Sequence, residues 1–518
     1  MSQAAPLLSF DAFIIHWAEE APERIALSEG STRMTFAELE AFTAKMVAAL
    51  IGAGIKKGDR IAWLGKNSEL YFALFYGAAR LGVVMSPIGW RLSPPEMAYI
   101  IDDTEARLLF TGPGFAETAR AIQKDLPYIE RIFSDEEARD WIEAATPTDF
   151  TPAGPNDAVL QLYTSGTTGK PKGAVLSNRN LFGLRLPTED AGLPWAKWDG
   201  DEVVLVAMPC AHIGGTGLGV MALAAGVGGH VLPEFSPDGV LDAVEQSGVT
   251  RFFMVPAALQ MITTHPRAAT TDFGRLKYIF YGAAPIPLEL LRECMRIFGA
   301  EFVQAYGMTE TTGTIVSLWP EDHDPNGNQR MRGQGRPLPG VELKIVDEAG
   351  NTLPPHSVGE LMTRSSNNMI SYWKLPEATA TTVTADGWLA TGDAAFLDED
   401  GYLYIHDRMK DMIITGGENV YPAEVESAIY GHPAIAEVAV IGVPDDKWGE
   451  AVKAVCVAKP GMTIDEADVI AWTRAKIAAF KVPKSIDIIA ALPRNASGKI
   501  LRKDLRAPYW EGRARMVN

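Results

Sequence analysis

Cysteine is scarce in this 518-residue chain, and so is any segment that would mark an exported protein. The three cysteines, at positions 210, 294 and 456, lie far apart and form no CxxC pattern. This spacing argues against a disulfide framework or a zinc site and is typical of a reducing compartment. The N-terminus lacks a basic segment followed by a long apolar core, as an export signal would have. We therefore expect a cytoplasmic protein.

Positively charged residues are also few, because the chain has 47 Lys and Arg but 65 Asp and Glu, which gives a formal net charge of −18. Phosphate backbones and anionic membranes repel such a chain, so we expect no nucleic-acid partner. Residues 203–233 contain no charged side chain, which raises the question of a membrane span. Because Pro209 and seven glycines interrupt this stretch, it predicts a strand, a loop and a buried helix instead, with no transmembrane segment.

Strand-like apolar runs alternate with amphipathic helices through most of the chain. Thr35 and Glu38 form a capping box that predicts a helix continuing to about residue 53. Apolar runs at 60–65 and 83–88 flank a helical pattern near 69–82. This alternation predicts an α/β fold of layered sheets, with ligands at the carboxyl ends of the strands. Later runs of the same kind lie at 203–209, 252–256, 278–284 and 302–307.

The pattern changes after about residue 340, where short paired runs are joined by turns. These runs predict an antiparallel β subdomain at about 335–407. From Asp411 onward a new alternation of strands and helices predicts a small α+β domain. We place the boundary within 406–412, so that the large N-terminal domain spans 1–407 and the C-terminal domain spans 408–518.

The most informative segment is YTSGTTGKPKG at 163–173, which follows a strand pattern. Its glycines would let backbone N–H groups approach a phosphate, its hydroxyls would donate hydrogen bonds, and its lysines would supply positive charge. The spacing is not that of a Walker A loop, because two residues separate Gly166 from Gly169 and a proline follows Lys170. A hairpin that merely connects two strands is the alternative.

This segment resembles the phosphate loop of the adenylate-forming (AMP-binding) superfamily, and further matches follow in the family's order from about residue 30 to 505. The resemblance is to the acyl-CoA synthetase, or fatty-acid–CoA ligase, branch. It implies an enzyme that activates a carboxylic acid with ATP and transfers the acyl group to CoA, with Mg²⁺ as cofactor. The ATP-binding loop residues implied are Thr164, Ser165, Gly166, Thr167, Thr168, Gly169 and Lys170.

The segment QAYGMTE at 304–310 resembles the family's second core motif. The resemblance implies that Tyr306 stacks on adenine, that Thr309 reaches the α-phosphate and that Glu310 holds Mg²⁺. A hard cation that bridges phosphate oxygens prefers a carboxylate ligand, which agrees with this role. Seen alone, Glu310 would be interpreted as a solvated residue at a helix start.

Two further segments complete the expected nucleotide site. In YGAAP, the resemblance implies that Gly282, Ala283 and Ala284 stay small to admit the flat adenine ring, although a packed turn is the alternative. In TGD, it implies that Asp393 accepts both ribose hydroxyls, and Arg408 would reach the ribose and phosphate.

The last core motif, PRNASGKILR at 493–502, contains Lys499. The resemblance implies that Lys499 enters the site during adenylation and bridges the carboxylate of the acid and the α-phosphate. Loss of one such preorganised donor costs on the order of 3–4 kcal/mol of transition-state stabilisation. Lys410 falls at the family's hinge position, so we expect a mobile C-terminal domain that pivots there.

Several shorter matches to the family imply which residues bind CoA, the acceptor of the acyl group. Val482 departs from the pattern, because some aryl-CoA ligases carry an arginine there, and Lys481 or Lys484 is expected to substitute. The implied CoA-binding residues are Gly416, Gly417, Trp448, Arg91 and Phe480.

His212 matches the family's gate at the acyl site, with Gly307 and Met308 as further acyl contacts. No Asp precedes His212 in VAMPCAH, which disfavours an amino-acid substrate whose ammonium group would need a carboxylate partner. We interpret the glycines that follow as residues that leave volume for an apolar chain or ring: Gly214, Gly215, Gly217 and Gly219. The expected catalytic residues are Lys499, Glu310, Thr309 and His212.

These patterns favour a medium- or long-chain fatty acid as substrate. An aryl acid, benzoate- or cinnamate-like, stays open, as do a carrier-protein acceptor and a luciferase-like oxygenase. An inactive nucleotide-binding scaffold is the alternative from another class, and a homodimer is also left open.

Overall fold

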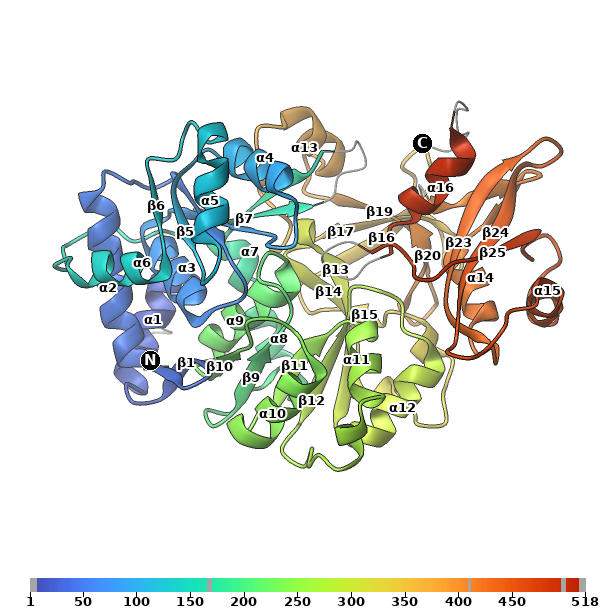
Figure 1. Ribbon diagram of the computed structural model, residues 1–518, viewed down its shortest axis with the longest axis horizontal. Helices are drawn as coiled ribbons and strands as arrows, with labels where there is room; N and C mark the ends of the chain where they lie inside the picture. The colour runs from blue at the N-terminus through green and yellow to red at the C-terminus, as the bar shows by residue number, and fades with distance from the viewer. Residues whose placement is uncertain (1–6, 165–169, 409–410, 495–499, 512–518) are drawn as a thin grey trace.

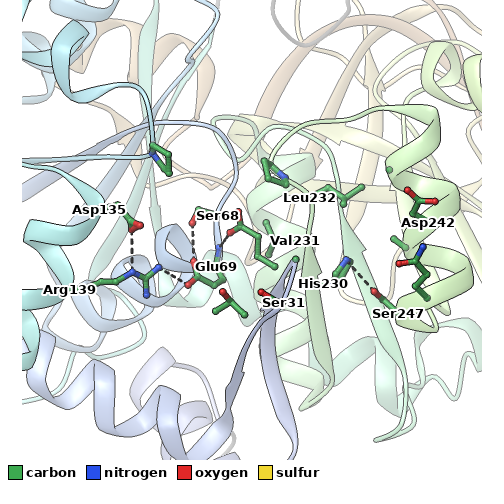
Figure 2. A pocket seen from close by; sticks show the side chains of 18 residues that line it. Ser31, Ser68, Glu69, Asp135, Arg139, His230, Val231, Leu232, Asp242 and Ser247 are labelled. Atoms are coloured by element: carbon green, nitrogen blue, oxygen red, sulfur yellow. Dashed lines mark hydrogen bonds and ion pairs between the residues drawn. The ribbon is translucent and has the colours of Figure 1, made fainter.

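The computed structural model describes residues 7–164, 170–408, 411–494 and 500–511 (Figure 1). In this described part of the chain, the strands form four sheets. Two large sheets and the helices around them make up the N-terminal part, a small antiparallel sheet follows, and a compact C-terminal domain lies at the other end of the molecule. This architecture confirms the predicted α/β fold class.

One large sheet has seven strands in the order β18-β8-β7-β4-β3-β5-β6. Its central strands are parallel, whereas β8 pairs antiparallel with both β7 and β18. The strands are β3 (Arg60–Leu64), β4 (Val84–Ile88), β5 (Ala106–Thr111), β6 (Arg131–Phe133), β7 (Ala158–Thr164), β8 (Lys172–Ser177) and β18 (Ser371–Tyr372).

The other large sheet has nine strands in the order β15-β14-β13-β12-β11-β9-β10-β1-β2. The run from β13 to β1 is parallel, so the carboxyl ends of β11, β12 and β13 meet at one edge. The strands are β1 (Ile25–Glu29), β2 (Thr32–Thr35), β9 (Val203–Val206), β10 (Gly228–Val231), β11 (Arg251–Met254), β12 (Tyr278–Gly282), β13 (Glu301–Met308), β14 (Gly313–Leu318) and β15 (Arg336–Pro337).

Helices cover both large sheets, and the predicted helix at α2 begins with the expected capping box between Thr35 and Glu38. Every residue of α3 is buried, because this apolar helix packs into the main core with α1, α2 and α9. The helices of this part are α1 (Phe10–Glu20), α2 (Phe36–Gly52), α3 (Glu69–Leu81), α4 (Pro94–Thr104), α5 (Ala116–Ile122), α6 (Asp135–Glu143), α7 (Asn178–Phe182), α8 (Arg185–Asp190), α9 (Ile213–Ala225), α10 (Pro237–Ser247), α11 (Pro256–Thr263) and α12 (Leu288–Phe298).

The uncharged stretch 203–233 forms β9, α9 and β10, as its glycines and proline predict. Helix α9 is 13 residues long, too short to cross a hydrocarbon core. Within the described residues, no helix combines the length and the apolar character that a membrane crossing requires.

A third sheet has the four antiparallel strands β16 (Glu342–Val346), β17 (Gly359–Arg364), β19 (Leu389–Leu397) and β20 (Leu403–Arg408). It agrees with the predicted antiparallel unit, with one exception. Strand β18 and helix α13 (Pro376–Thr382) come between β17 and β19 in the chain, yet β18 adds to the seven-stranded sheet. The chain therefore leaves the small sheet and returns to it.

The C-terminal domain contains a five-stranded sheet in which β23 and β24 form a long hairpin, and β24 also pairs with β21 and β25. The expected alternation of strands and helices after Asp411 is thus present. Its elements are β21 (Ile413–Thr415), β22 (Glu418–Val420), α14 (Pro422–Ile429), β23 (Ile435–Asp445), β24 (Gly449–Ala458), α15 (Glu466–Arg474), β25 (Ser485–Ile488) and α16 (Arg502–Trp510).

A buried ion pair fixes the loop before β9 against the nine-stranded sheet. Arg251 at the start of β11 and Glu202 are 1% and 2% exposed, and the guanidinium also donates to the carbonyl of Trp195. The rings of Trp198 and Tyr278 lie 4.7 and 4.6 Å from the guanidinium carbon. Hydrogen bonds and two aromatic faces therefore compensate for the removal of this charge from water.

The same ion pair makes the stability of the fold depend on pH. Burial alone would raise the pKa of Glu202, but hydrogen bonds from Arg251 and Lys277 outweigh burial and lower this pKa below its ordinary value. A carboxyl with a lowered pKa in the folded state stabilises the fold above its unfolded pKa, about 4.3, and loses this contribution as the pH falls toward the folded value.

We expect Glu202→Gln to lower the free energy of unfolding by about 3–5 kcal/mol at pH 7, because Arg251 would remain buried without its counter-charge. Urea denaturation at pH 7 and pH 3.5 measures both effects, and the difference between variant and wild type should shrink at the lower pH. Asp199→Asn is the matched control, since Asp199 is exposed and 3.3 Å from Lys277, and it should cost less than about 1 kcal/mol. Equal losses of unfolding free energy in the two variants would contradict the stabilising role of the buried pair.

Candidate active site

The predicted nucleotide residues come together where strands of both large sheets end. Strand β7 ends at Thr164, β12 ends at Gly282, and β13 is followed by a short 3-10 turn of Thr309–Thr311 that contains Glu310. Thr164 and Glu310, which are 146 residues apart in the sequence, therefore meet at one edge, as expected for an α/β enzyme.

The carboxylate of Glu310 lies at the centre of this meeting point. Glu310 is 5% exposed, and its Oε1 accepts hydrogen bonds from Tyr372 Oη at 2.7 Å and from Thr164 Oγ1 at 3.3 Å. Both side-chain partners in the described part of the chain are neutral hydroxyls. A buried carboxylate held in this way is suited to a cation that arrives with a ligand.

The side chains around Glu310 offer a magnesium ion a single carboxylate. No group of three or more His, Cys, Asp or Glu side chains that could hold a metal occurs within the described residues. One carboxylate beside hydroxyl groups is instead typical of a Mg²⁺ ion that takes its other ligands from phosphate oxygens and water. Glu310 thus fits the predicted role, and half-buried Thr309 precedes it directly.

The expected adenine and ribose residues contact each other. Tyr306 Oη donates to Asp393 Oδ2 at 2.5 Å, and Asp393 is 5% exposed. Burial raises the pKa of Glu360, whose Oε1 accepts from the backbone N–H of Gly392, and the charge of Asp393 adds to this rise. In the β19–β20 ladder, Arg408 is the register partner of Asp393, which brings the two predicted ribose residues onto adjacent strands.

The turn after β12 explains why its residues are small. A Cβ on Gly282 would collide with the carbonyl oxygen of Ala305, so the neighbouring strand already requires glycine there. Ala283 has φ of 61°, a left-handed conformation that is rare for a residue with a side chain. Such strain is often found at ligand sites, where the surrounding structure enforces it.

Several predicted residues lie outside the described part of the chain. These are Ser165, Gly166, Thr167, Thr168 and Gly169 of the loop, Lys410 at the hinge, Lys499 of the last motif, and the side chain of Arg408. At the edges of the loop, Thr164 pairs with Lys172 in the β7–β8 hairpin, and Lys170 Nζ lies 5.3 Å from the ring of Tyr99. The described residues on either side of the loop therefore form an antiparallel strand pair, and phosphate binding by the loop stays a prediction.

His212 is the N-cap residue of α9, where its carbonyl accepts from the N–H groups of Gly215 and Thr216. Burial lowers the pKa of His212, and the positive charge of Arg91 lowers it further. A lowered pKa favours the neutral imidazole, which agrees with the predicted gate beside an apolar acyl group.

The expectation that four glycines of α9 leave volume is wrong for three of them. A Cβ on Gly214 would lie 2.9 Å from the ring of Phe253. A Cβ on Gly215 would collide with the carbonyl oxygens of the preceding loop, and a Cβ on Gly219 would collide with the ring of Phe72. Gly217 keeps ordinary spacing, with Ile213 3.5 Å away. The glycines mainly allow neighbours to approach α9 closely, which no sequence pattern around His212 indicates.

The further acyl residues lie at the end of β13. Gly307 faces the carbonyl oxygen of Gly313, with which any Cβ would collide, and Met308 is partly buried against the main core. These residues lie between Tyr306 and Glu310 in sequence. The acyl contacts predicted here are therefore adjacent to the predicted nucleotide contacts.

Residues expected to bind CoA form separate groups. Gly416 has φ of 60°, donates its N–H to the carbonyl of Trp448, and a Cβ on it would lie 2.7 Å from the Trp448 ring. Gly417, with φ of 86°, has open space beside it, and Trp448 is 42% exposed. These three residues thus form one surface of the C-terminal domain.

The remaining predicted CoA residues, Arg91 and Phe480, come from two other segments of the chain. Arg91 stacks on Trp90 at 4.3 Å, and Phe480 is 38% exposed. Lys481 forms an ion pair with Glu424 at 2.7 Å, whereas Lys484 is exposed. Of the two lysines expected to replace the missing arginine, Lys484 is therefore the one that offers an exposed side chain.

One site residue was not predicted from the sequence. Tyr372 contacts Glu310 directly, but it lies in a short segment between two strands of another sheet. A single aromatic residue before a Pro-containing helix start carries no signal of its own, and only pairing of β18 with β8 brings it to the site.

Comparison with known proteins identifies the family. The model of the AMP-binding enzyme family matches residues 14–373, and that of the AMP-binding enzyme C-terminal domain matches residues 424–499. Fatty acid–[acyl-carrier-protein] ligase ScoC of Streptomyces coeruleorubidus is 40% identical over 97% of this chain and 96% of its own length. Feruloyl-CoA synthase of an Amycolatopsis species is 37% identical over 95% of this chain and 97% of its own.

A solved structure gives the same result. The ATP-bound crystal structure of MatB from Rhodopseudomonas palustris matches with a TM-score of 0.86 and 31% identity, covering 97% of this chain and 99% of that one. Sequence and structure therefore agree over nearly the whole length. The chain belongs to the AMP-binding enzyme family, in the acyl-CoA synthetase branch of the adenylate-forming superfamily.

Proposed function

We propose that this protein is an AMP-forming acid–thiol ligase that converts a carboxylic acid to its acyl-adenylate and then to acyl-CoA. The observation that carries the proposal is a pair of hydrogen bonds, Thr164 to Glu310 and Tyr306 to Asp393, which lie at and near the ends of β7 and β13. A buried carboxylate for a cation and a second carboxylate for a ribose are what Mg²⁺-ATP requires. The relatives named as ligases and synthases support the same reaction class.

In the first half-reaction, a carboxylate oxygen of the acid attacks the α-phosphorus of ATP, and pyrophosphate leaves. Bound Mg²⁺ would neutralise charge on the phosphate oxygens, with Glu310 as its protein ligand. Asp393 and Tyr306 would orient the ribose and adenine, and Thr309 would donate to the α-phosphate. Lys499 would bridge the acid and the α-phosphate, where two anions approach one another.

In the second half-reaction, the thiol sulfur of CoA attacks the acyl carbonyl carbon, the thiol proton is released, and AMP leaves with the electrons of the broken C–O bond. We place the domain boundary near residue 407, with Lys410 as the hinge. Rotation there would withdraw Lys499 and bring Gly416 and Gly417 to the site. Arg91, Phe480 and Trp448 would then contact CoA.

The substrate we propose is a medium- or long-chain fatty acid, and the relative named as a fatty acid ligase supports this choice. Apolar side chains lie near His212, because Ile213 follows it in the chain and the ring of Phe253 lies close to Gly214. An aryl acid is the second candidate. The ring of Phe253 against Gly214 favours it, because aromatic walls suit a flat substrate, and a relative is named feruloyl-CoA synthase.

A carrier protein is the alternative acceptor, since the relative ScoC is named as an acyl-carrier-protein ligase. Both acceptors would present a thiol to the same adenylate. The surface of Gly416, Gly417 and Trp448 suits a slender thiol arm in either case, and the exposed charge of Lys484 favours an acceptor with a phosphate group.

A direct assay tests the proposal. Purified protein with ATP, Mg²⁺ and CoA should release AMP and form a thioester with at least one acid from a panel of fatty, aryl and dicarboxylic acids. Replacing CoA with a carrier protein in a parallel panel distinguishes the acceptors. Absence of acid-dependent pyrophosphate exchange across the panel would rule out adenylation.

We expect Lys499→Ala to slow adenylation by roughly 10²–10³-fold, because a preorganised donor at the transition state is lost. Conversion of preformed acyl-adenylate to thioester should continue at the wild-type rate. Pyrophosphate exchange and thioester formation, measured separately, check the two halves. If both halves fall equally, the account with two domain orientations is wrong.

We expect Gly416→Leu to show the opposite pattern, with adenylation retained and thioester formation reduced at least tenfold. The new side chain would meet the Trp448 ring and occupy the surface proposed for the thiol arm. Gly461→Leu is the matched control, because Gly461 also has a positive φ, 76°, but has nothing within 4 Å of an added Cβ. It should leave both half-reactions unchanged, and a similar loss there would assign the effect to backbone strain alone.

A further inference from the structure

The segment 367–373 connects the two halves of the nucleotide site by backbone hydrogen bonds. On one side, Met369 donates its N–H to the carbonyl of Glu310 at 2.8 Å. On the other side, Trp373 donates its N–H to the carbonyl of Gly173, the last residue of the phosphate-loop segment, at 2.7 Å. The segment therefore contacts the strand that leaves the loop and the turn that carries the carboxylate.

Side chains hold this connection in place. The indole N–H of Trp373 donates to the carbonyl of Asp103 at 2.9 Å, and the guanidinium of Arg60 lies 3.4 Å from the centre of the Trp373 ring. Thr312 Oγ1 donates to the carbonyl of Asn367 at 2.6 Å. A side chain on this segment is consequently held in one position relative to both parts of the site.

Tyr372 is the residue of this segment whose side chain contacts Glu310. It is 7% exposed, its ring packs in the main core, and its hydroxyl lies 2.7 Å from Glu310 Oε1. Thr164 donates to the same oxygen, Oε1. Within the described residues, Glu310 Oε2 has no hydrogen-bond donor. The two hydroxyls thus fix one oxygen of the carboxylate and leave the other available.

We propose that Tyr372 is a positioning residue, which holds Glu310 through Oε1 so that Oε2 is presented to the magnesium ion that accompanies ATP. This inference rests on the proposed function, because it takes Mg²⁺-ATP as the ligand. Hydrogen-bond partners of a metal-binding carboxylate fix its orientation, and their removal typically costs 10–100-fold in metal affinity. Tyr372 acts through Glu310 and does not contact the reacting atoms.

Tyr372→Phe removes the hydroxyl and keeps the ring, so the core packing of the side chain is preserved. The probe is a non-hydrolysable ATP analogue with a methylene bridge between the α- and β-phosphates, titrated calorimetrically in Mg²⁺ and in EDTA. In the wild type, Mg²⁺ should increase the affinity for the analogue. We expect the ratio of the affinity in Mg²⁺ to the affinity in EDTA to be about tenfold smaller in the variant. Affinity in EDTA should change less than twofold, because the nucleotide contacts themselves remain.

Tyr402→Phe is the matched control. Tyr402 is 4% exposed, and its hydroxyl donates to both oxygens of the Asp322 carboxylate, at 2.9 and 3.0 Å, away from Glu310. The same chemical change is made there to another buried tyrosine with a carboxylate partner. Its affinities in Mg²⁺ and in EDTA should both match those of the wild type.

Two further variants keep the test decisive even if Tyr372→Phe folds poorly. Thr164→Val removes the longer hydrogen bond to the same oxygen and should give a smaller loss in the same direction. In a Glu310→Gln background, Tyr372→Phe should change Mg²⁺-dependent binding less than twofold, because its effect passes through Glu310. Additive losses would overturn the proposal.

Other outcomes also decide it. An equal loss of nucleotide affinity in Mg²⁺ and in EDTA would make Tyr372 a purely structural residue. The same conclusion would follow if Mg²⁺ did not change nucleotide affinity in the wild type. The titration needs no acid substrate and no turnover. If it behaves as expected while no acid supports pyrophosphate exchange, the proposed ligase activity fails and the positioning role stands.

Discussion

The rest of the site depends on one buried negative charge, the carboxylate of Glu310. A carboxylate removed from water is costly unless hydrogen bonds or a cation compensate it. Here the hydroxyls of Tyr372 and Thr164 supply the hydrogen bonds, and each comes from a strand of the seven-stranded sheet. Glu310 itself follows a strand of the nine-stranded sheet. The two sheets are thus joined at the residue that the proposed chemistry needs most.

The strands and helices that the sequence predicted best are those with a strong period or a capping signal. The capping box at Thr35 and the apolar strands at 60–64 and 84–88 needed no tertiary information, because local composition determines them. The small antiparallel sheet was also predicted. What failed was the assumption that neighbours in sequence stay in one sheet, because β18 pairs with β8, about two hundred residues earlier.

The site shows the same division. Glu310, Tyr306 and Asp393 were predicted by resemblance, and the structure adds that Tyr306 and Asp393 form a hydrogen bond. The glycines of α9 were misinterpreted, because a glycine in a sequence signals either free space or close approach, and only three-dimensional neighbours distinguish the two. Tyr372 could not be found for a related reason, since its importance comes entirely from a partner 62 residues away in the chain.

The path of the chain through β18 also limits how such a protein can be recombined. The sheet of β16, β17, β19 and β20 looks like an exchangeable module, but residues 367–373 leave it to pair with a strand of the neighbouring sheet. A crossover point between β17 and β18 would take Tyr372 from a different parent than β8, the strand with which β18 pairs. Exchange of the small sheet as one block would therefore also replace the strand that pairs with β8 and the tyrosine that contacts Glu310.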